Sequence, residues 1–107
     1  MKTLADFKRA LTVGRVLQYI YHETTFYKGE TGKIAYKQTS YEPEKRTVKT
    51  VSSSQVSFTK ENGTVTWLQF PKASECLIEG NKVTILEPCD RIEGKPMLPI
   101  ITYIFSE

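Results

Sequence analysis

The stretch Val56–Leu86 decides the fold, and its first half reads VSFTKENGTVTWLQF. An Asn-Gly pair, Asn62-Gly63, lies between two runs rich in residues that favour strands. Asn-Gly is typical of two-residue type I′ turns, in which both central residues need positive φ. Such a turn places Phe58 opposite Trp67. We therefore predict a β-hairpin whose buried face carries Val56, Phe58, Val65 and Trp67.

The second half of this stretch contains CLIEGNKVTI, residues 76–85. A two-residue turn at Gly80-Asn81 puts its apolar residues on a single face. In that register Ile78 lies opposite Val83, and Cys76 lies opposite Ile85. The stretch as a whole therefore predicts two consecutive hairpins.

The N-terminal segment predicts a short helix that ends before Gly14. Thr3 can cap the helix, with Asp6 completing a shortened capping box. Helical spacing then produces an apolar stripe. A helix of three turns at most is not stable alone in water, so it must pack on the sheet. The stripe consists of Leu4, Phe7 and Leu11.

The remaining segments of the sequence complete the predicted fold. We expect loops at Thr24–Lys33 and Asp90–Pro99, where glycines and prolines collect among charged residues. The sequence therefore predicts an α+β fold in a single domain, residues 1–107. In it a short N-terminal helix packs on a strongly bent antiparallel sheet or half-barrel of five to six strands. Besides the two hairpins, the expected strands are Arg15–Glu23, Lys33–Gln38, Arg46–Val51 and Ile100–Phe105.

The composition indicates a globular chain, with 39% hydrophobic and 25% charged residues in a total of 107. No apolar run approaches the roughly 18 residues that cross a bilayer. The first residues lack the apolar core and cleavage site of a secretory signal. We therefore expect a cytoplasmic protein without membrane contact.

The net charge of +3 is distributed unevenly. Residues 1–60 contain eleven Lys/Arg and five Asp/Glu, whereas residues 61–107 contain four and seven. Such asymmetry can mark a nucleic-acid face or a docking surface. It also arises by chance on a solvated surface.

No catalytic or cofactor motif is present in the sequence. The two cysteines, Cys76 and Cys89, have no metal-ligand spacing, and the single histidine, His22, has no titratable partner at a recognisable distance. Glu42 and Glu44 flank a proline in an expected turn, where solvated charges are common. We therefore expect no enzymatic activity, no metal and no cofactor.

Tyrosines alternate with basic residues between Arg15 and Arg46. This combination suits stacking of single-stranded nucleic acid, a protein interface, or simple packing within the sheet. The partner-binding candidates in this region are Tyr27, Tyr36, Tyr41, Lys45 and Arg46. A second candidate is the acidic loop with Glu87, Asp90 and Glu93, whose carboxylates can take the place of phosphates on a partner's basic residues.

Three segments, Met1–Leu11, Phe70–Cys76 and Asn81–Ile85, resemble small uncharacterised proteins carried by phages and plasmids of Gram-positive bacteria. Small non-enzymatic proteins of such elements often act as stoichiometric inhibitors of host defence, anti-CRISPR proteins among them. The resemblance implies a protein-binding inhibitor of a host protein or ribonucleoprotein complex. The alternative is a small protein that binds single-stranded nucleic acid. The oligomeric state stays open.

Overall fold

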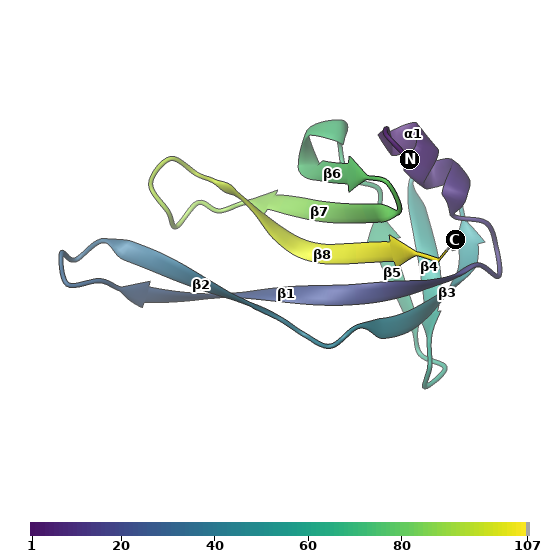
Figure 1. The fold of residues 1–107 in the computed structure, drawn as a ribbon, viewed down its shortest axis with the longest axis horizontal. Coiled ribbons are helices and arrows are strands. Elements are labelled where there is room, and N and C mark those ends of the chain that lie inside the picture. Colours follow the sequence, from purple (N-terminus) through teal and green to yellow (C-terminus); the bar gives the residue numbers. More distant parts are fainter. Residues whose placement is uncertain (107) are drawn as a thin grey trace.

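The computed structural model describes residues 1–106, which form one helix and eight antiparallel strands (Figure 1). The predicted helix on an antiparallel sheet is confirmed. The rest of the prediction is corrected: the fold is mainly β instead of α+β, and the sheet has eight strands instead of five or six and is open instead of strongly curled. The elements are α1 (Leu4–Ala10), β1 (Val16–Lys28), β2 (Ile34–Ser40), β3 (Glu44–Val51), β4 (Gln55–Lys60), β5 (Val65–Gln69), the 3₁₀ turn η1 (Ala73–Glu75), β6 (Cys76–Glu79), β7 (Lys82–Pro88) and β8 (Met97–Phe105).

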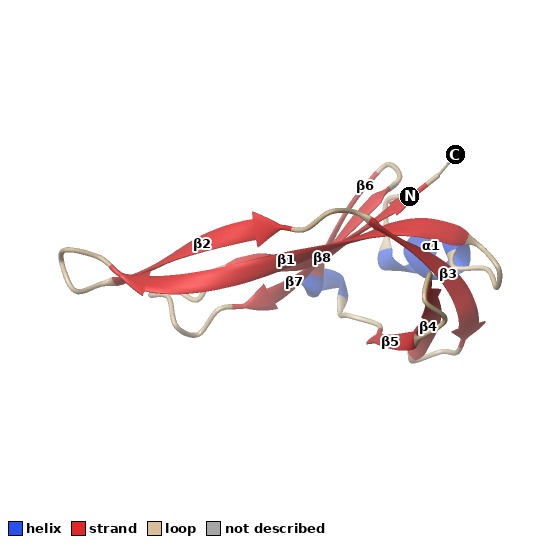
Figure 2. Cartoon of the chain, turned by 90° about the horizontal axis from the view of Figure 1, so that it is seen from below, coloured by secondary structure: helices blue, strands red, loops and turns tan. Residues whose placement is uncertain are grey.

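Strand β1 organises the sheet, whose order is β5-β4-β3-β1-β8-β7-β6. Its first half pairs with β3 on one side and β8 on the other, and its second half pairs with β2. Pairing with β8 ends at Tyr21 and Ile101. Pro99, two residues before Ile101 in β8, has no N–H for a ladder hydrogen bond to β1. The paired strands β1 and β2 therefore project as a two-stranded arm, residues 22–40 (Figures 1 and 2).

The core lies between α1 and the inner face of the sheet. Phe7 of α1 is fully buried, and its ring centroid lies 6.1 Å from that of Tyr103 and 6.0 Å from that of Phe105. The predicted capping box is confirmed: Thr3 accepts from the backbone N–H of Asp6, and the Asp6 carboxylate accepts from that of Thr3. Hydrogen bonds from backbone N–H groups, that of Lys2 first, lower the pKa of Asp6 to about 2.

The hairpin of β4 and β5 differs by one residue of register from the prediction. Ser57, not Phe58, lies opposite Trp67, and Val56 lies opposite Leu68. The loop has three residues, because Lys60 N–H donates to Thr64 O (2.8 Å) and only its last residue, a glycine, has positive φ. A one-residue shift moves every side chain to the other face. Trp67 is therefore 61% exposed, and its predicted burial with Val65 beside Phe58 is wrong.

The hairpin of β6 and β7 is confirmed in its predicted register. Ile78 lies opposite Val83, and Cys76 lies opposite Ile85. Gly80 has a φ of 61°, as a type II′ turn requires at its first central position.

The predicted loop Thr24–Lys33 is largely wrong. Strand β1 continues to Lys28, and only the turn between Gly29 and Lys33 reverses the chain, with Gly29 N–H donating to Lys33 O (2.9 Å). The threonine and aromatic residues of Thr24–Lys33 favour a strand, and this preference outweighs that of the two glycines for a loop. The predicted strand Lys33–Gln38 is confirmed as β2.

Candidate functional site

A row of aromatic side chains leads from the core to the surface along β1. Leu17, Tyr19 and Tyr21 share the inner face because side chains alternate along a strand. Leu17 is buried, Tyr19 is half-buried with its ring centroid 5.8 Å from that of Tyr103, and Tyr21 is 42% exposed. The apolar face of the sheet thus continues past the helix and opens to solvent.

Tyr41 stacks on Tyr21 at the exposed end of this row. Their ring centroids are 5.6 Å apart and the ring planes differ by 11°. The backbone N–H of Tyr41 donates to Tyr21 O (2.9 Å), and the Tyr41 hydroxyl donates to the Glu23 carboxylate. We call Tyr21 and Tyr41 the tyrosine platform. Tyr41 is 48% exposed, so the platform is held in place and yet open to a partner.

Arg46 lies at the inner end of the same row. It is only 5% exposed, and its guanidinium carbon lies 4.1 Å from the centroid of the Tyr19 ring. A guanidinium nitrogen of Arg46 donates to Glu44 Oε2 at 3.1 Å. Burial raises the pKa of Tyr19, so this phenol stays neutral at physiological pH. Arg46 is therefore fixed in place by a ring face and a carboxylate.

A hollow of about 520 Å³ connects the platform with Arg46. Its lining combines aromatic rings, carboxylates and cations. The lining residues are Tyr19, Tyr21, Tyr41, Glu42, Glu44, Arg46 and Lys60. Of the predicted candidates, the structure brings Tyr41 and Arg46 together at this surface.

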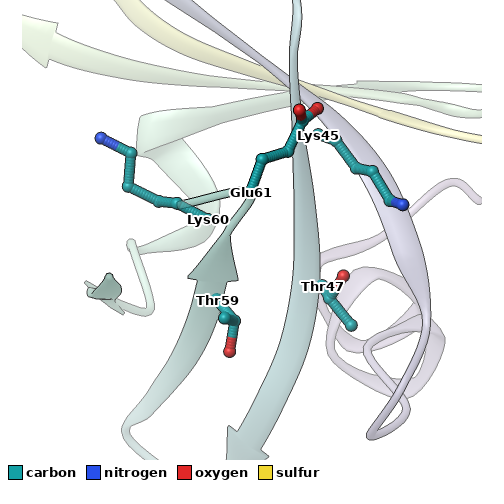
Figure 3. A pocket seen from close by; sticks show the side chains of 5 residues that line it. All are labelled: Lys45, Thr47, Thr59, Lys60 and Glu61. Carbon is teal, nitrogen blue, oxygen red and sulfur yellow. The ribbon is translucent and has the colours of Figure 1, made fainter. Parts of the chain in front are cut away.

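Lys45 lies on the other face of β3 from Arg46. It lines a second hollow of about 360 Å³ together with Thr47, Thr59, Lys60 and Glu61, and Figure 3 shows these side chains. The amines of Lys45 and Lys60 point away from each other (Figure 3). The predicted pair of Lys45 and Arg46 is thus divided between two faces because neighbouring residues of a strand alternate.

The other two predicted tyrosines lie on opposite faces of the arm. Tyr27 lies opposite Ala35, and Tyr36 lies opposite Phe26 in the neighbouring pair. Both are exposed, by 55% for Tyr27 and 40% for Tyr36. Tyr27 shares a face with Tyr21 but lies about 20 Å along the strand from it. Neither residue belongs to the platform.

The predicted acidic site begins at the end of β7 and continues into the β7–β8 loop. Glu87, Asp90 and Glu93 are exposed there. Arg91 interrupts the acidic residues, and its guanidinium carbon lies 4.4 Å from the centroid of the Phe26 ring. This contact holds the loop against the arm, and the intervening cation reduces the negative charge of the site.

His22 connects three strands at the base of the arm. Its Nδ1 lies 2.7 Å from Ser40 Oγ, and its Nε2 lies 2.6 Å from Thr102 Oγ1. Burial lowers the pKa of His22. With both ring nitrogens bonded to hydroxyl groups, this histidine has a structural place in the sheet.

The sequence did not identify Tyr21 as a site residue, since its alternation with Leu17 and Tyr19 is also what a packing residue shows. Within residues 1–106, no group of three or more His, Cys, Asp or Glu is arranged to hold a metal ion, and no helix is long and apolar enough to span a membrane. Comparisons with protein-family models, curated proteins and solved structures found no match to the chain.

Proposed function

We propose that this protein is a non-enzymatic inhibitor that binds a host protein or ribonucleoprotein complex through the tyrosine platform. The observation that carries the proposal is the exposed, hydrogen-bonded stack of Tyr21 and Tyr41, next to a fixed arginine. Tyrosine and arginine dominate the energetic centres of protein interfaces, and side chains already held in place lose little entropy on binding.

The target class comes from the resemblance to phage and plasmid proteins. A mobile element benefits from blocking a nucleic-acid complex of host defence, such as a CRISPR effector. An inhibitor that covers a surface needs exposed anchors and no catalytic pocket.

The charges around the platform favour a protein partner over nucleic acid. Glu23 accepts from the Tyr41 hydroxyl, Glu42 lines the hollow, and Glu44 pairs with Arg46. These carboxylates repel phosphates, and the Arg46 guanidinium already has an anionic partner.

Affinity capture with matched variants tests the proposal. The tagged protein is passed through lysates containing candidate CRISPR effectors, beside a Tyr21→Ala/Tyr41→Ala variant and a Trp67→Ala control. The control removes an exposed aromatic residue on the outer face of β5. We expect the wild type and the control to retain an effector. The double variant should retain at least about tenfold less effector than the wild type. If nothing co-purifies while the protein still blocks the effector in cells, direct occlusion is wrong.

The second candidate function is binding of single-stranded nucleic acid. It is favoured by the exposed stack of Tyr21 and Tyr41, whose outer ring faces can stack with bases. Such binding falls steeply as salt rises, because counterions are released. A gel shift at low salt with DNA and RNA oligonucleotides tests it, and absence of any shift removes this candidate.

A further inference from the structure

The contacts of Arg46 define a small recognition unit made of a ring, a carboxylate and a guanidinium. Tyr19 and Glu44 are cross-strand partners on β1 and β3. The guanidinium carbon of Arg46 lies 4.1 Å from the Tyr19 ring centroid, and its nitrogen bonds to the Glu44 carboxylate at 3.1 Å. The face of the guanidinium thereby stacks on a ring, and its edge donates to a carboxylate.

The platform has the same types of side chain, an aromatic ring and a glutamate, but in the part of the chain that the structure describes no cation lies over its rings. Tyr21 follows Tyr19 by two residues, and Glu42 precedes Glu44 by two. Both Tyr21 and Glu42 line the same hollow. Tyr41 adds a second ring, and Glu23 lies at its hydroxyl. Among residues 1–106, the cations that lie over aromatic rings are over Phe70, Phe105, Tyr19 and Phe26, so both platform rings are free of a cation.

We infer that the tyrosine platform binds an arginine side chain of the partner protein, with the guanidinium stacked on an outer ring face and bonded to Glu42. This inference rests on the proposed function and names the chemistry of its partner. Arginine suits the site better than lysine because its planar guanidinium stacks on aromatic rings and pairs with both oxygens of a carboxylate. Proteins that handle nucleic acid use such arginines to hold phosphates. Occupying one would therefore displace the nucleic acid.

A peptide titration followed by NMR tests this chemistry without the natural partner. The probe is the blocked peptide Gly-Arg-Arg-Arg-Gly, compared with the same peptide carrying three lysines or three glutamates. Because the net charge of +3 gives cationic peptides no general attraction to the protein, the shifted amide signals report which local site binds them. We expect shifts of the Tyr21, Tyr41 and Glu42 amide signals, with affinity about two- to fivefold higher for arginine than for lysine.

Matched variants assign the binding to the proposed groups. Glu42→Gln keeps the size of the side chain and removes its charge, whereas Glu79→Gln makes the same change at the exposed end of β6. We expect weaker arginine-peptide binding for Glu42→Gln alone. The inference is overturned if arginine and lysine peptides bind alike, if the glutamate peptide binds at the platform, or if the shifts map to Glu87–Glu93. If the peptide fails while Tyr21→Ala/Tyr41→Ala still abolishes effector capture, the proposed function stands and the arginine chemistry is wrong.

Discussion

Trp67 and Phe58 show how the burial of an aromatic residue determines its contribution to the stability of the fold. Phe58 is 1% exposed, with its ring centroid 5.3 Å from that of Tyr103, whereas Trp67 is 61% exposed. We expect Phe58→Ala to lower the free energy of unfolding by about 3–5 kcal/mol. Trp67→Ala should lower it by less than about 1 kcal/mol. Urea denaturation measures both, and a large loss for Trp67→Ala would contradict the three-residue turn.

His22 gives a pH prediction at the same scale. Burial lowers its pKa below the ordinary value of 6.5, so the unfolded chain takes up the proton first. Stability is therefore fully present above pH 6.5 and declines as the pH falls below it. Because the chain has one histidine, its imidazole NMR signals report the folded pKa directly. A folded pKa above 6.5 would contradict burial as the main influence on this ring.

At the scale of elements, the sequence predicted one hairpin register and missed the other. In β7 of the second hairpin, the buried Val83 and Ile85 are separated by the polar Thr84, so only one register places apolar side chains of β6 beside them. That register leaves one apolar residue, Leu77, exposed. In β5, Trp67 and Leu68 are adjacent, and either can face Val56. The alternation of apolar residues therefore does not determine the register of this hairpin; the length of the turn does.

The turn itself can be tested with two substitutions. Gly63 has a φ of 85°, whereas Asn62 has negative φ and accepts from the Thr64 N–H at 3.0 Å. We expect Gly63→Ala to cost about 1–2 kcal/mol of stability through backbone strain. Asn62→Ala loses one exposed hydrogen bond and should cost at most about 1 kcal/mol. Thermal or urea unfolding measures the difference, and a larger cost for Asn62→Ala would indicate the two-residue turn.

At the scale of the whole molecule, the arm and the platform depend on one long strand. The molecule measures 50 × 29 × 23 Å, and the arm forms one end of its long axis (Figure 2). The platform forms where β1 exchanges its partner β3 for β2, because Tyr41 lies in the connection between those two strands. Local sequence patterns predict strands, but not which strands share an edge of β1. For this reason the sequence identified Tyr41 and missed its stacking on Tyr21.

The most direct test of the platform as an inhibitory surface is a titration of DNA cleavage by a purified CRISPR effector that the protein captures. We expect inhibition to be complete near one protein per effector, since the proposed inhibitor acts by occupying a surface. Trp67→Ala should match the wild type, and Tyr21→Ala/Tyr41→Ala should need at least about tenfold more protein. Inhibition far below equimolar amounts, or full inhibition by the double variant, would contradict this function and this surface.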